Sequence, residues 1–188
     1  MDARTAQAAL TGGIAGPVAF AASWAALGAT TGAPYSPVHD AISRLAATGA
    51  PTQAAMTAGI TALGAGLAAF GYGFSRAHGE RAAGTAALLS GIASLGVAAI
   101  PLGSPTRDLA HGVAATIGYA TLAATPLLAR RPFPRPLSVA AGVACAACLV
   151  ATTLDVANGL FQRTGISIGH AWIAAAAVTS LRRATPTR

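Results

Sequence analysis

Charged residues are scarce in this sequence, and lysine is missing altogether. Only 9% of the 188 residues are charged, whereas charged residues make up about 25% of a typical soluble domain. Aromatic residues are also few, at 5%, while 54% of the residues are hydrophobic and the mean hydropathy is +0.58. This balance excludes an ordinary soluble domain and predicts an integral membrane protein.

Motifs of well-known soluble enzymes are missing as well. The sequence has no Walker loop, no GxSxG nucleophile elbow, no HExxH zinc motif and no dinucleotide-binding fingerprint. Its two cysteines, Cys145 and Cys148, lie in an apolar segment without the strand–helix pattern of a redox domain. We interpret both as small apolar packing residues, and we predict no particular cofactor.

The net charge of +7 comes from arginines that stand singly or in pairs between apolar runs. They form no basic stripe, so we expect no nucleic-acid partner. Arginine at the ends of apolar segments is typical of residues that meet lipid headgroups. The expected partner is therefore the lipid bilayer, whereas the oligomeric state is left open.

Apolar runs of spanning length recur along the chain, separated by short breaks rich in proline and glycine. The predicted spans are roughly Leu10–Thr31, Gln53–Ser75, Ala82–Ile100, Asp108–Ala129, Leu137–Ala157 and Gly165–Leu181. The last is the shortest. We predict an all-α, polytopic membrane bundle of about six transmembrane helices, forming one domain over residues 1–188.

The distribution of arginine predicts the orientation of this bundle. With six spans, one side holds nine arginines: Arg4, Arg76, Arg81, Arg130, Arg131, Arg135, Arg182, Arg183 and Arg188. The other side holds Arg44, Arg107 and Arg163. The positive-inside rule then places both termini, including a basic tail at residues 182–188, in the cytoplasm of a multi-pass cell-membrane protein.

The longest polar interruption, at residues 33–52, is expected to form an outer-side loop or short helix. A helix between Pro37 and Thr48 would place His39 and Ser43 on one face. His39, Asp40 and Ser43 are then candidates for base, orienter and nucleophile. The alternative is that Asp40 and Ser43 cap the segment and have a structural role.

Further polar residues gather at the same predicted end. Asp108 and His111 open the fourth span on one helical face, Asp155 lies near the end of the fifth, and His170 lies within the sixth. A carboxylate in a span is costly, so it is usually paired or functional. We include all four as catalytic candidates, beside structural alternatives: helix-dipole compensation by Asp108, pairing of Asp155 with an arginine, and a hydrogen-bonded His170.

Ligand-binding roles are predicted for a second set. Arg44, Arg107 and Arg163 can clamp a phosphate, or can instead pair with the three outer aspartates. Tyr35 and Gln162 complete the predicted substrate-binding set. His39, His111 and His170 with one aspartate are a possible zinc set, although nothing in their spacing requires it.

Three stretches resemble a known family. Tyr35-Ser36-Pro37, Ile42-Ser43-Arg44-Leu45 and Gly49-Ala50-Pro51 resemble the opening signature of a bacterial membrane-protein family catalogued as domain of unknown function nine-nine-eight. The break from Pro101 to His111 and the run Gly159-Leu160-Phe161-Gln162-Arg163 resemble its later motifs. Ala46 stands where this family usually has glycine.

This resemblance implies a compact bundle of about six helices, distantly similar to the Frag/DRAM/Sfk membrane proteins, and it implies no established reaction. Two hypotheses follow from the residues. The first is an intramembrane enzyme acting on a lipid or isoprenoid, for example by acid-catalysed cyclisation. The alternative is a non-enzymatic lipid-binding or assembly protein whose polar residues form a structural network. A small-solute transporter ranks third.

Overall fold

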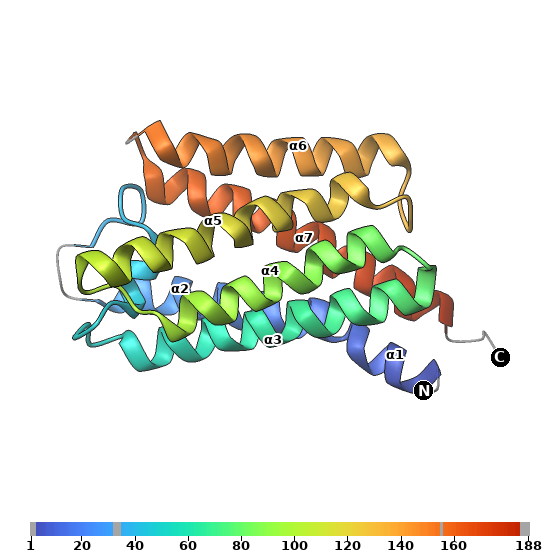
Figure 1. Cartoon of the computed structure of the whole chain (residues 1–188), viewed down its shortest axis with the longest axis horizontal. Coiled ribbons are helices and arrows are strands. Elements are labelled where there is room, and N and C mark those ends of the chain that lie inside the picture. Colours follow the sequence, from blue (N-terminus) through green and yellow to red (C-terminus); the bar gives the residue numbers. More distant parts are fainter. Residues whose placement is uncertain (1–2, 32–34, 155, 185–188) are drawn as a thin grey trace.

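The computed structural model describes residues 3–31, 35–154 and 156–184. Within these ranges the chain forms helices and turns and contains no strand. The elements are α1 (Ala3–Leu10), α2 (Gly12–Thr30), η1 (Ile42–Ala46), α3 (Gln53–His78), α4 (Arg81–Ala99), α5 (Pro105–Leu128), α6 (Arg135–Ala151), η2 (Thr152–Leu154) and α7 (Asn158–Ala184). The long helices run up and down side by side (Figure 1).

The bundle has two distinct ends (Figure 1). At the termini end, α1 begins, α7 ends, and short connections join α3 to α4 and α5 to α6. At the loop end, residues 35–52 precede α3, residues 100–104 join α4 to α5, and η2 precedes α7. Because α1 begins and α7 ends at the same end, the chain crosses the bundle an even number of times.

The predicted membrane bundle is confirmed. Within the described residues, five segments are long and apolar enough to cross a membrane: Arg4–Thr30, Gln53–His78, Arg81–Ala99, Arg135–Leu154 and Asn158–Arg183. Helix α5 is not among them, but its 24 residues are sufficient to span the bilayer. Its exposed Leu109, Val113 and Ile117 are four residues apart and form one apolar face, so we treat α5 as the sixth span.

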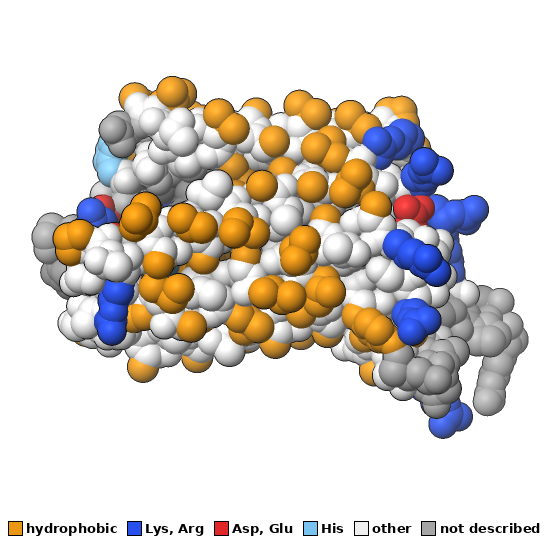
Figure 2. Space-filling view, in the orientation of Figure 1, with side chains coloured by type: hydrophobic (Ala, Val, Ile, Leu, Met, Phe, Trp, Pro, Cys, Tyr) orange, Lys and Arg blue, Asp and Glu red, His pale blue; other side chains and the backbone are white. Residues whose placement is uncertain are grey.

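The surface agrees with this assignment. On the face shown in Figure 2, hydrophobic side chains cover the middle of the bundle and arginines gather at its two ends. More of them lie at the termini end in this view. The predicted cytoplasmic location of the termini is based on this uneven distribution of arginine. The orientation stays a prediction.

The last span is much longer than the sequence indicated. We expected roughly Gly165–Leu181, but α7 has 27 residues and begins at Asn158. Its first turns contain Gln162 and Arg163, which hydropathy counts as a break. Both side chains are buried because the loop end supplies their hydrogen-bond partners. Polar residues thus continue a buried helix when their partners are provided.

Glycines let the neighbouring helices touch through their backbones. A Cβ atom on Gly66 of α3 would lie 2.5 Å from the carbonyl oxygen of Gly12 in α2. On the opposite side of α3, a Cβ on Gly71 would lie 2.5 Å from the backbone nitrogen of Leu88 in α4. Without a hydrophobic drive inside lipid, such close approach provides the dispersion contacts that hold helices together.

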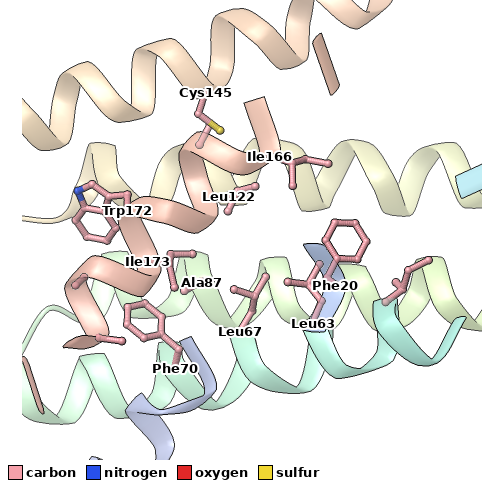
Figure 3. Packing of buried hydrophobic residues seen from close by; sticks show 14 of the residues in the cluster. Phe20, Leu63, Leu67, Phe70, Ala87, Leu122, Cys145, Ile166, Trp172 and Ile173 are labelled. Carbon is pink, nitrogen blue, oxygen red and sulfur yellow. The ribbon is translucent and has the colours of Figure 1, made fainter. Parts of the chain in front are cut away.

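The half of the bundle nearer the termini end is tightly packed with aromatic side chains. The rings of Phe70 and Phe74 stack with centroids 5.2 Å apart, and Phe74 meets Trp172 edge-on at 6.2 Å. Figure 3 shows Phe70 and Trp172 on one side of the core, with Phe20 and Ile166 on the other. Phe20 and Ile166 border a cavity in the half nearer the loop end.

The polar segment forms a loop with one short helix, which covers less of the chain than the stretch between Pro37 and Thr48. Instead of one helix between Pro37 and Thr48, a turn at residues 37–40 leads into the short helix η1, which begins at Ile42. His39 therefore precedes the helix and does not share a helical face with Ser43. Ile42 and Leu45 of η1 are buried, so this segment closes the loop end of the bundle.

Candidate functional site

A cavity lies inside the half of the bundle nearer the loop end. Its volume is about 70 Å³. Helices α2, α3, α4, α5, α7 and η1 contribute its lining residues: Phe20, Ile42, Ser43, Ile60, Leu63, Ser90, Ser94, Val97, His111, Ala115, Gly118, Tyr119, Leu122, Gln162, Ile166 and His170. The lining is mostly apolar, with a few polar groups from separate helices, as in small-molecule sites.

His111 enters this cavity from the second turn of α5. It is 5% exposed, and its Nδ1 lies 2.7 Å from the carbonyl oxygen of Ile100. This carbonyl is available because α4 ends at Ala99, just before Pro101. A carbonyl can only accept, so Nδ1 carries the proton. In the neutral imidazole, Nε2 is then the nitrogen with a free lone pair.

His170 enters the same cavity from the middle of α7. It is 7% exposed, and its ring packs edge-on against Phe20 with centroids 5.9 Å apart. Neither ring nitrogen has a hydrogen-bond partner among the residues that the structure describes. Packing therefore positions this ring, and its nitrogens are available to a molecule in the cavity.

Gln162 connects three walls of the cavity. Its Oε1 accepts a hydrogen bond of 2.7 Å from the backbone N–H of Ile42, and its Nε2 donates to the hydroxyl of Tyr119. The amide thus joins α7 to η1 and to α5. Because both ends of the amide are engaged, Gln162 fixes the shape of the cavity.

Arg163 fastens the polar segment to α7. Its Nη1 donates to the carbonyls of Pro37 at 2.7 Å and Asp40 at 3.0 Å, as well as to Gly159 at 2.9 Å. Its Nη2 donates to the hydroxyl of Tyr35. The side chain is 8% exposed, and within the described ranges its Nε has no hydrogen-bond partner. This guanidinium therefore serves chiefly to hold the chain around residues 35–40.

Two aromatic rings flank the same guanidinium. Its carbon lies 5.4 Å from the ring centroid of Trp24 and 5.7 Å from that of Tyr35. Burial raises the pKa of the Tyr35 phenol, and the neighbouring charge of Arg163 partly opposes this shift. Tyr35 is therefore neutral at physiological pH and accepts from Arg163 as a hydroxyl.

Gly159 lets the start of α7 approach the backbone of the polar segment closely. A Cβ at this position would lie 2.6 Å from the carbonyl oxygen of Pro37, and closer still to that of Asp40. The backbone of Leu160 also donates to the carbonyl of Val38 at 2.9 Å. Two stretches that are distant in sequence, around Tyr35–Asp40 and Gly159–Arg163, thus form one interlocked unit.

Other predicted residues lie at the loop end of the bundle, outside the cavity lining. Asp40 accepts from the backbone N–H of Ser36 at 2.7 Å and lies 3.4 Å from Nε of Arg44, whose side chain is 69% exposed. Asp108 is exposed and accepts from the backbone N–H of Gly103 at 2.9 Å. The contact of Asp40 fits its structural alternative, whereas Asp108, in the first turn of α5, bonds the backbone that precedes the helix. His39 and Arg107 are exposed.

The sequence-predicted set therefore divides in two. Ser43, His111, Gln162 and His170 meet at the cavity, whereas His39, Asp40, Arg44, Arg107 and Asp108 do not line it. Tyr35 and Arg163 lie beside it and hold the loop end together. Asp155 lies outside the described residues. Among those that are described, no three histidine, cysteine or acidic residues gather as a metal site.

Some lining residues were not predicted, although periodicity could have identified them. Tyr119 follows His111 by eight residues, with Ala115 between, so all three lie on one face of α5. Ser90 and Ser94 are likewise four residues apart on α4. Extending a helical face from each histidine would have found Tyr119, but no sequence signal indicates which face of α4 turns toward His111.

Comparison with other proteins places the chain in a family. No curated protein and no solved structure matches it. The family model described as "Protein of unknown function (DUF998)" matches residues 14–179, which include every described residue of the cavity lining. The chain therefore belongs to the DUF998 family of proteins of unknown function.

Proposed function

We propose that this protein is an intramembrane enzyme that acts on an amphipathic lipid or isoprenoid by proton transfer. The observation that carries the proposal is that His111 and His170, 59 positions apart in the sequence, line one cavity inside an apolar bundle. Imidazole is the side chain best suited to exchange protons near neutral pH. A mostly apolar lining suits the chain of a lipid-like molecule.

In this proposal His111 is the general base. Its Nδ1–H donates to the Ile100 carbonyl, so Nε2 can accept a proton from the substrate. The same carbonyl then stabilises the imidazolium that forms, because its negative end faces the charged ring. His170, which has no described hydrogen-bond partner, gives a proton to a second atom of the substrate as His111 removes one from the first, so the substrate is isomerised with no net gain or loss of protons. The hydroxyl of Ser43 orients the substrate.

A second candidate is a non-enzymatic lipid-binding protein whose polar residues are structural. The observation that favours it is the engagement of Gln162 and Arg163 by the backbone of the loop end. In addition, no carboxylate among the described residues lines the cavity. Under this alternative, the histidines only bind the polar group of a resident lipid.

Lipid analysis in the native organism separates these candidates. The gene is deleted and then restored as wild type, His111→Gln, His170→Gln or His39→Gln, and lipid extracts are compared by mass spectrometry. His39→Gln is the matched control, because this imidazole is exposed and lies outside the cavity lining. Folding of each variant is checked by its elution and melting temperature in detergent.

We expect deletion to shift the amount of at least one lipid, and wild type and His39→Gln to reverse the shift. His111→Gln and His170→Gln should convert that lipid about 100-fold more slowly than wild type, because acid–base catalysis usually contributes a factor of this size. Full reversal by both folded cavity variants would overturn proton transfer by these histidines. A lipid profile unchanged by deletion would favour the non-enzymatic candidate.

A further inference from the structure

We infer that the molecule bound in this cavity has an uncharged polar head, a hydroxyl or carbonyl group attached to an apolar chain. The inference rests on the proposed function in taking the cavity as the binding site, and it goes further by naming the class of head group. It excludes phosphorylated lipids and prenyl diphosphates, which the arginines at this end of the bundle would otherwise suggest.

The charges of the surrounding residues give the first argument. The sixteen described lining residues include no arginine, aspartate or glutamate. Arg44 and Arg107 are exposed and do not line the cavity. Arg163 is buried, but its Nη1 and Nη2 donate to Pro37, Asp40, Gly159 and Tyr35. Its Nε has no described partner, but Arg163 is not among the lining residues. A phosphate in the cavity would therefore lack the forked cationic donors that such groups need in a dry site.

The hydrogen-bond inventory of the cavity gives the second argument. In the neutral imidazole, His111 Nε2 is an acceptor, because Nδ1 carries the proton. The Tyr119 hydroxyl accepts from Gln162, so its own proton remains to be donated. A hydroxyl head can donate to His111 and accept from Tyr119, and a carbonyl head can accept from Tyr119 or Ser43. Neutral groups thus satisfy the cavity, whereas an anion would face the lone pair of the neutral His111 imidazole.

The size of the cavity gives the third argument. A volume of about 70 Å³ is far below the roughly 300–1,000 Å³ of pockets that bury most of a drug-sized ligand. It therefore encloses a small head and the first carbons of a chain, and not a whole lipid. Such a site discriminates by the head group, because only the head is surrounded by protein.

Binding measurements with paired probes test the inference. The purified full-length protein in nanodiscs is titrated with tritiated geranylgeraniol and with a diacylglycerol, which represent isoprenoid and acyl sources of the same neutral chemistry. Their phosphorylated counterparts, geranylgeranyl diphosphate and phosphatidic acid, are the charged probes. Ala115→Phe fills the cavity and reports whether binding occurs there, with Ala120→Phe on the exposed face of α5 as its control.

We expect at least one neutral probe to bind about 100-fold more tightly than its phosphorylated counterpart, because burying an unpaired anion is costly. Ala115→Phe should abolish this binding and Ala120→Phe should not. Tyr119→Phe should weaken the binding of the neutral probe about tenfold, which is the effect of losing one buried hydrogen bond. Tyr72→Phe, on α3 outside the cavity lining, should leave it unchanged.

The other outcomes separate this inference from the proposed function. Tighter binding of a phosphorylated probe that Ala115→Phe abolishes would overturn the neutral head and keep the cavity as the site. If the probes bind but Ala115→Phe does not weaken the binding of any of them, or if no probe binds at all, both the neutral head group and the proposed function are refuted. Preference between geranylgeraniol and diacylglycerol decides the source of the chain.

Discussion

The side-chain amide oxygen of Gln162 accepts a hydrogen bond of 2.7 Å from the backbone N–H of Ile42, 120 residues earlier in the chain. This contact joins the polar segment, which closes the loop end, to the helix that carries His170. Arg163, the next residue, holds the same segment through three further contacts to Tyr35, Pro37 and Asp40. The cavity therefore depends on an interlock between two short motifs.

The first prediction concerns Gln162→Leu. Without the amide, the buried N–H of Ile42 has no acceptor, and the free energy that holds η1 in place falls by about 1–3 kcal/mol. Hydrogen exchange of a peptide covering residues 41–48 should accelerate about tenfold. Gln53→Leu is the control, because Gln53 accepts from Gly49 on the exposed surface. Equal exchange in both variants would contradict the role of Gln162.

Arg163→Gln should lower stability more than any exposed arginine variant. Three carbonyl groups lose a charged donor, so we expect a loss of about 3 kcal/mol in unfolding free energy, measured by thermal unfolding in detergent. Arg163→Lys should recover only part of it, since an ammonium lacks the planar fork. Arg107→Gln, an exposed control, should change stability by less than about 0.5 kcal/mol. A wild-type melting curve for Arg163→Gln would exclude this fastening role.

A methyl group at Gly159 should separate the two motifs. Gly159→Ala places a Cβ against the carbonyls of Pro37 and Asp40, and we expect a loss of about 2 kcal/mol in the same assay. Gly112→Ala on α5 has open space around its Cβ, so it should stabilise the helix by up to about 1 kcal/mol. If the two variants melt at the same temperature, Gly159 is not required for this contact.

Backbone contact between α3 and α4 gives a fourth prediction. Gly71→Ala forces the two helices apart, because its Cβ would lie 2.5 Å from the backbone nitrogen of Leu88. The expected loss is about 2 kcal/mol. Gly96→Ala is the control, since its Cβ would lie 3.5 Å from that of Ala114, an ordinary contact. Tolerance of Gly71→Ala would mean that these helices pack through other residues.

Labelling can determine the orientation of the bundle. In a background in which Cys145 and Cys148 are alanine, single cysteines replace Arg107 at the loop end and Arg81 at the termini end. The arginine distribution predicts that a membrane-impermeant maleimide labels Arg107→Cys in intact cells, and Arg81→Cys only after permeabilisation. The reverse pattern would show that the cavity lies toward the cytoplasm.

Part of the candidate site could be predicted from the free-energy cost of burying polar side chains. Placing His111 and His170 in apolar segments is unfavourable unless they have partners or a function, and both line the cavity. Gln162, from the predicted break before the last span, lines it as well. The same argument does not reveal the partner of each group. Asp108 was expected to be either catalytic or a compensating charge, and its hydrogen bond to the backbone of Gly103 follows from the local turn, which hydropathy does not describe.

The sequence by itself determined the class of protein, the number of long helices and several candidate residues of the site. Hydropathy and helical periodicity are local properties, and the bilayer fixes how long each span must be. Only the tertiary structure decided that Gln162 and Arg163 continue α7, that Tyr119 and His111 line one cavity, and that Asp40 and Asp108 bond the backbone of nearby turns. Each of these outcomes depends on partners brought from far along the chain, because a buried polar group is stable only where the fold supplies its hydrogen bonds.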